Sequence, residues 1–127
     1  MKAIAILSWV LLPSVMFGGY SLLSLLRRNA LRPEQVTLFR AGHAHAGVLL
    51  VLSLVYQQYM ATTALAPAAQ AGASAVLLTG ILLHSGGFFW HAFVDRKGQA
   101  LGVSMTVTGA LLLAAAVLVL VWGLVSA

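Results

Sequence analysis

Residues 41–62 read AGHAHAGVLLVLSLVYQQYMAT, a stretch without a charged side chain, and this stretch decides the fold. A helix needs about 20 mostly apolar residues to cross the hydrocarbon core of a bilayer. Three further stretches meet the same requirement, so the sequence predicts spanning helices over residues 3–26, 41–62, 71–94 and 100–126. We therefore expect an all-α integral membrane protein, with one domain over residues 1–127 embedded in the lipid bilayer.

Composition separates this chain from soluble proteins. Of its 127 residues, 61% are hydrophobic and only 7% are charged, whereas soluble domains carry about a quarter charged residues. The net charge of +5 does not indicate nucleic-acid binding, because every charged residue lies outside the predicted spans. The chain contains no cysteine, which excludes disulfides, iron–sulfur clusters and thiolate zinc sites. The charged residues are Lys2, Arg27, Arg28, Arg32, Glu34, Arg40, Asp95, Arg96 and Lys97.

The basic residues predict an orientation in the membrane. They gather in the loop after the first span and in the loop after the third, while residues 63–70 carry no charge. The positive-inside rule places those two loops in the cytoplasm and both termini on the outer, periplasmic side. Short loops make each helix antiparallel to the next, which predicts an antiparallel four-helix bundle. We expect a bacterial inner membrane, since no eukaryotic targeting segment is visible.

Several residues outside the histidines have simple structural interpretations. Pro33 and Glu34 are expected to open a short interfacial helix before the second span. Gln57 and Gln58 are interpreted as polar residues at the outer end of that span. The small residues Gly102, Thr106 and Gly109 share one face of the fourth span, which is typical of close packing between membrane helices.

Four histidines lie within the predicted spans, where ionisable groups are costly and usually functional. His43, His45 and His91 are near cytoplasmic ends, so we expect them at one level, with His84 deeper. His43 and His45 are two residues apart and point about 200° apart around a helix. Only one of them can therefore face the interior of a bundle. His84 and His91 share a face but are too far apart for one small metal ion.

Imidazoles without thiolate or carboxylate partners disfavour Mg and Ca, and they suit haem iron, copper or zinc. Small residues around the second-span histidines, Ala44 and Gly47 among them, leave room for a flat macrocycle. Arg40 is placed to pair with a haem propionate. Among these metal centres the segment therefore favours haem, with His43 or His45 as its ligand. The same small residues also suit plain helix packing.

A second group of residues in the third span is a candidate pocket for a small apolar substrate. It comprises His84, Ser85, Phe88 and Phe89. A hydrogen bond between helices explains His84 equally well, and anchoring at the interface explains His91. No catalytic residue is assigned.

Two motifs resemble those of the four-span membrane isomerases, namely styrene oxide isomerase and hydroxylaminobenzene mutase. They are Ala44-His45-Ala46-Gly47, and Gly87-Phe88-Phe89 followed by Arg96-Lys97-Gly98. The resemblance covers roughly the second and third spans. It implies a trimer that holds haem b, with His45 as the axial ligand and ferric iron as the Lewis acid that turns an epoxide into an aldehyde. The family's Asn six residues after its histidine and the Tyr of its second motif are replaced here by Val51 and Phe89.

Three functions stay open on these grounds. The first is a membrane haem isomerase acting on a small apolar oxygenated substrate, as a homo-oligomer. The second is a b-type electron-transfer or redox-sensing protein, in which His91 is a second axial ligand beside His45 or His43. The third is a small non-catalytic subunit of a membrane complex. A transporter is disfavoured, because the spans contain no coupling carboxylate and no pair of broken helices.

Overall fold

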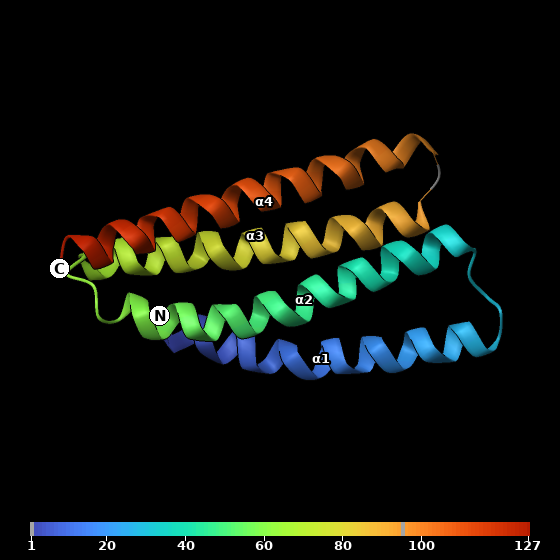
Figure 1. Ribbon diagram of the computed structural model, residues 1–127, viewed down its shortest axis with the longest axis horizontal. Helices are drawn as coiled ribbons and strands as arrows, with labels where there is room; N and C mark the ends of the chain where they lie inside the picture. The colour runs from blue at the N-terminus through green and yellow to red at the C-terminus, as the bar shows by residue number, and fades with distance from the viewer. Residues whose placement is uncertain (1, 95) are drawn as a thin grey trace.

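Four α-helices make up almost the whole chain in the computed structural model, which describes residues 2–94 and 96–127 apart from the side chains of residues 96 and 97. They are α1 (Lys2–Arg27), α2 (Pro33–Met60), α3 (Pro67–Phe93) and α4 (Arg96–Val125). Consecutive helices run in opposite directions along the long axis (Figure 1). All four contain stretches long and apolar enough to cross a membrane. The predicted cytoplasmic charges of Asp95, Arg96 and Lys97 lie outside the described residues.

Helix α2 begins at Pro33, about two turns before the predicted start of the second span at residue 41. Proline suits the first turn of a helix, because its missing N–H would have no partner there. The backbone N–H of Arg32 donates to Oε1 of Gln35 at 3.0 Å, and the amide of Gln35 donates to the carbonyl of Ala92 at 3.0 Å. The segment predicted as a short interfacial helix is therefore the first part of α2.

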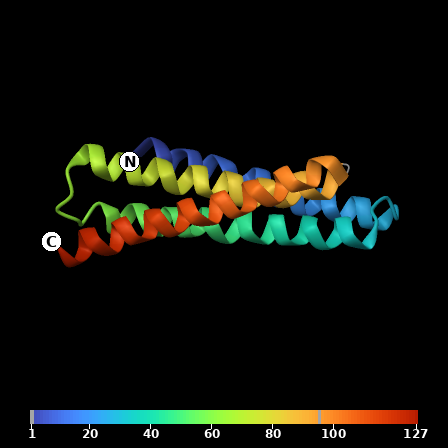
Figure 2. The same cartoon turned by 90° about the horizontal axis from the view of Figure 1, so that it is seen from above.

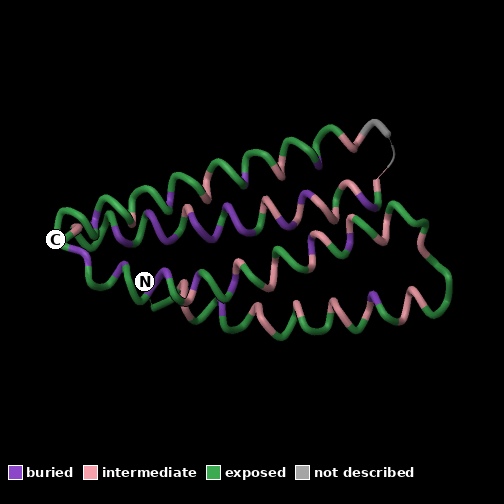
Figure 3. Tube along the Cα trace, viewed as in Figure 1, coloured by how far each residue is buried: buried purple, intermediate pink, exposed green. Residues whose placement is uncertain are grey.

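The four helices form an open, staggered row (Figures 1 and 2). Helix α2 packs between α1 and α3, and α4 packs chiefly on α3. In the described part of the chain, α1 and α4 do not contact each other. The helices differ in burial according to their contacts. Helix α3 is the most buried, and α4 leaves most of its length exposed (Figure 3). Two apolar edges of the row are thus open to lipid or to another protein.

Small residues spaced seven apart join α3 to α4. Without side chains between them, the two backbones touch: a Cβ added to Gly109 would lie 2.7 Å from the carbonyl oxygen of Gly80 and would collide with the backbone N of His84. A Cβ on Gly102 would lie 2.9 Å from the carbonyl oxygen of Gly87. This confirms the predicted packing face of the fourth span. The buried small residues that follow the seven-residue spacing are Ala73, Gly80 and Gly87 on α3, and Gly102, Gly109, Ala116 and Gly123 on α4.

Polar side chains form hydrogen bonds between helices near the end of the row that carries the loop between α2 and α3. Ser8 of α1 and Ser53 of α2 share a hydrogen bond of 3.0 Å, and Ser74 of α3 donates to Oε1 of Gln57 at 3.0 Å. Gln57 is only 6% exposed. Gln57 and Gln58 both lie near the end of α2, but the side chain of Gln57 is buried between helices whereas that of Gln58 is exposed. Such hydrogen bonds connect membrane helices where the hydrophobic effect cannot.

Because the backbones of α3 and α4 are in contact, a glycine-to-alanine substitution between them is expected to lower stability strongly. Gly109→Ala should lower the free energy of unfolding by about 1–3 kcal/mol, because the added methyl meets backbone that has no room to move. Gly72→Ala on α3 is the matched control, since a Cβ there meets nothing within 4 Å. Unfolding in detergent, followed by circular dichroism during titration with SDS, measures both. Equal stability of the two variants would contradict the proposed backbone contact.

Candidate functional site

Three aromatic rings from two helices meet in the middle of the row. The ring centres of His45 on α2 and His84 on α3 lie 4.9 Å apart, with an interplanar angle of 70°. Phe88, one turn after His84, stacks on the His45 ring at 5.2 Å and meets the His84 ring edge-on at 5.5 Å. The helices approach closely enough because Gly42 lies at their crossing, where a Cβ would be 3.1 Å from the carbonyl oxygen of Ser85.

Hydrogen bonds fix both histidine rings in the same way. Nδ1 of His45 lies 2.7 Å from the carbonyl oxygen of Ala41, and Nδ1 of His84 lies 2.9 Å from the carbonyl oxygen of Thr106 on α4. A carbonyl oxygen only accepts, so each Nδ1 carries the proton. In a neutral ring this leaves the lone pair on Nε2. Histidines that bind metals use the same arrangement, in which the second nitrogen is anchored by hydrogen bonding.

His45 pairs with His84, so the prediction that His45 lies level with His91 is wrong. His91 lies farther along α3, where it lines a cavity of about 130 Å³ together with Leu38 of α2 and Thr106 of α4. The prediction counted residues from the charged ends, where α2 starts earlier than expected. Counting from the short loop between α2 and α3 would have placed both histidines of α2 near the level of His84, since His43 and His45 lie 17 and 15 residues before Met60 and His84 lies 17 residues after Pro67.

His43 faces away from this pair, toward α1. A Cβ on Gly19 would lie 3.1 Å from Nε2 of His43, and a Cβ on Gly18 would lie 3.5 Å from its Nδ1. The two glycines of α1 thus make the space that the His43 ring occupies. This agrees with the expectation from helical geometry that His43 and His45 cannot face the same side.

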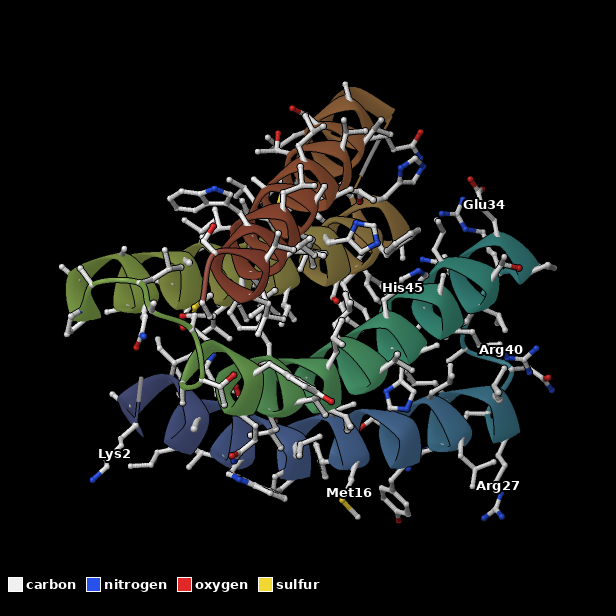
Figure 4. All side chains as sticks on the ribbon, turned by 60° about the vertical axis from the view of Figure 1, so that its left-hand side comes forward. Lys2, Met16, Arg27, Glu34, Arg40 and His45 are labelled. Carbon is white, nitrogen blue, oxygen red and sulfur yellow. The ribbon has the colours of Figure 1, made fainter. Side chains whose placement is uncertain are left out.

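The residues predicted to surround a cofactor fall on different faces of α2. Ala44 and His45 line one exposed groove of about 210 Å³. Gly47 faces α1, since its nearest neighbour is a methyl of Val15. Arg40 is exposed and lies five residues before His45, about 140° around the helix. Figure 4 shows Arg40 at the same end of the molecule as Arg27 and Glu34, with Lys2 at the other end.

The predicted substrate pocket of the third span divides into two places. His84 and Phe88 contact His45, on the side of α3 where Thr106 of α4 also lies. Ser85 and Phe89 line a separate cavity of about 200 Å³, shared with α1 and α2. The helical period explains this division, because adjacent residues point about 100° apart.

The distance between the His45 and His84 rings can be compared with the distance that each kind of metal centre requires. A tetrahedral ion with metal–nitrogen bonds of about 2.0–2.1 Å would hold two imidazole ring centres about 5 Å apart, and His45 and His84 are at 4.9 Å. Two imidazoles on opposite sides of a haem iron would lie about 6 Å apart or more. Within residues 2–94 and 98–127, no group of three metal-ligating side chains gathers.

The hydrogen bonds predict the tautomers of His45 and His84. Nitrogen-15 NMR of the histidine side chains should show Nδ1 protonated and Nε2 unprotonated in neutral His45 and His84. His45→Ala and His84→Ala assign the signals. The reverse tautomer in either ring would contradict the hydrogen bonds to Ala41 and Thr106.

Comparisons of the chain with protein-family models, with curated proteins and with solved structures give no match.

Proposed function

We propose that this chain is an integral membrane haem b protein, with His45 as the axial ligand, that isomerises a small apolar oxygenated substrate. The observation that supports it best is the state of His45, an exposed intramembrane imidazole whose Nδ1 is anchored on Ala41. Its Nε2 is the nitrogen left to bind iron. Both the epoxide-to-carbonyl chemistry and the choice of haem as the bound group are inferred from the motif resemblance.

The surroundings of His45 fit a flat ligand. Ala41, Ala44 and Val48 flank the histidine along the helix and carry no bulky or charged group. Phe88 stacks on the ring and limits its rotation. Arg40, the predicted partner of a propionate, is on the side of α2 that carries His43. If Arg40 holds a propionate of a haem on His45, its long side chain has to reach around α2.

An oligomer would complete this site. The groove at Ala44 and His45 is open to the outside of the chain, and the free edges of α1 and α4 expose large apolar side chains such as Phe17 and Leu118. A neighbouring copy against this groove would enclose the cofactor and exclude water. We therefore propose a homo-oligomer, a trimer by resemblance, in a bacterial inner membrane with both termini periplasmic.

When bound, ferric haem would supply a Lewis acid for a substrate oxygen. The chain's own part is to orient His45 through Ala41 and Phe88, and to keep the surroundings apolar. Val51 and Phe89 stand where the resembling family has polar groups, so this chain adds no hydrogen bond to a substrate at those positions. We therefore expect a substrate held by shape and apolar contact more than by polar recognition.

The axial ligand can be tested with a pair of variants. Protein purified in detergent after expression with ample haem should show a Soret band that His45→Ala loses and His43→Ala keeps, because His43 faces α1. External imidazole added to His45→Gly should restore the band. A band lost only in His43→Ala would move the ligand to the other face of α2. No band in the wild type would overturn the haem proposal.

The same samples separate the isomerase from the electron-transfer alternative. An isomerase needs five-coordinate, high-spin iron, and conversion of styrene oxide to phenylacetaldehyde can be followed by gas chromatography. A six-coordinate, low-spin haem without turnover would instead favour electron transfer. If His91 were the second ligand, His91→Ala would change the spin state.

A metal ion on the histidine pair is the second candidate, favoured by the 4.9 Å separation of the two rings. Under this proposal His45 and His84 both bind copper or zinc. His84→Ala should then weaken binding of the added ion at least tenfold, as His45→Ala does, when binding is measured by calorimetry. Under the haem proposal His84→Ala should keep the Soret band, and the ion should bind neither variant nor wild type with significant affinity.

A further inference from the structure

The charged end of α1 carries a groove that has no role in the proposed haem site. It has a volume of about 220 Å³ and is open toward the outer edge of the row. Residues three or four positions apart share one face of a helix, and this is the spacing of the residues that line the groove. They are Tyr20, Leu23, Ser24, Arg27 and Arg28.

The guanidinium groups of Arg27 and Arg28 have no partner within the chain. In the part of the chain that the structure describes, neither forms a hydrogen bond or an ion pair. Arginines in the last turn of a helix often bond to the final carbonyls. Here the backbone closes the helix instead: Asn29 has a φ of 49°, and its N–H and that of Ala30 donate to carbonyls of the last turn at 3.0 Å. Both charges are therefore available to an anion from outside the chain.

Ser24 adds a free hydroxyl to the same groove. Its neighbour Ser21 donates to the carbonyl of Phe17 at 3.0 Å, as serine in a helix often does. The half-buried hydroxyl of Ser24 makes no such bond within the described residues. It can therefore donate to an oxygen of the same anion that the arginines attract.

The deeper part of the groove is apolar, which favours a lipid over a soluble anion. Tyr20 lies seven residues before Arg27, about 10 Å along the helix axis. Its ring lies beside that of Phe17, with the ring centres 6.4 Å apart, and each residue is 69% exposed. In Figure 4 the side chain of Arg27 points away from the other helices. A soluble anion would contact only the arginines, whereas a phospholipid can place its phosphate there and an acyl chain along the rings.

We propose that this groove binds a phospholipid of net negative charge, with Arg27 and Arg28 on its phosphate and Ser24 donating a hydrogen bond. Guanidinium groups bind phosphate strongly, often with two parallel hydrogen bonds. A zwitterionic headgroup fits less well, because its cationic group would lie against two arginines. The groove is on α1 and does not include His45. The proposal therefore does not depend on whether the protein holds haem.

Three phosphorus-containing probes test the proposal. Phosphorus-31 NMR follows dihexanoyl phosphatidylglycerol, dihexanoyl phosphatidylcholine and inorganic phosphate during titration with the full chain. The detergent is dodecyl maltoside, which contains no phosphorus, and empty micelles are the blank. Phosphatidylglycerol should bind saturably and about 5- to 30-fold more tightly than phosphatidylcholine, because two arginines attract its net charge. Inorganic phosphate should bind about tenfold more weakly than phosphatidylglycerol, because it makes no apolar contact.

Variants separate this site from a general attraction to the basic loop. Arg27→Gln/Arg28→Gln should give the two lipids equal affinity, and both side chains are exposed, so the variant is expected to fold. Ser24→Ala should weaken phosphatidylglycerol about 3- to 10-fold. Arg32→Gln is the matched control, since it removes a charge from the same loop but outside the groove, and it should keep the preference.

Three results would contradict the proposal. A preference for phosphatidylglycerol that survives Arg27→Gln/Arg28→Gln would place the lipid elsewhere. An equal loss of preference in Arg32→Gln would show that the charge of the loop matters and the groove does not. Inorganic phosphate that binds as tightly as phosphatidylglycerol would make the groove a site for a soluble anion.

Discussion

The direct contact between the backbones of α3 and α4 is the constraint on which the rest of the structure depends. Because Gly80 and Gly109 carry no side chain, the carbonyl of Thr106 comes within 2.9 Å of Nδ1 of His84. That hydrogen bond holds the His84 ring in one tautomer. Gly42 then brings α2 close enough for His45 to meet His84. The histidine pair is thus a consequence of where the chain has glycine.

Helix α3 separates two chemically different regions. Successive residues serve opposite sides, so His84 belongs to the histidine pair and Ser85 to the apolar cavity. One side carries the paired rings of His45 and His84, beside a groove at Ala44 and His45 that is open at the surface of the chain. The other carries the buried hydroxyl of Ser85, beside a mostly apolar groove that α3 shares with α1 and α2. The two regions have no lining residue in common.

The sequence predicts the number and approximate extent of the helices, because the charged residues stop where the apolar spans start. It separates the helix that starts at Pro33 from the second span, whereas the two are one continuous helix, α2. That error displaced the histidines along the helix axis and hid the pair of His45 and His84. The opposed faces of His43 and His45 follow from helical geometry alone. The burial of Gln57 could not be predicted, since it depends on Ser74 of another helix.

The seven-residue spacing of small side chains on α3 and α4 also limits which insertions these two helices can accept. A repeat of seven drifts by about 20° per heptad on a straight helix, so contact over several heptads requires the pair to coil around each other with a left-handed twist. Inserting one codon within Gly102–Gly123 would rotate all later small residues about 100° off the seam. Inserting seven would keep them on it. Length variation in these two helices should therefore be tolerated in whole heptads and at their ends.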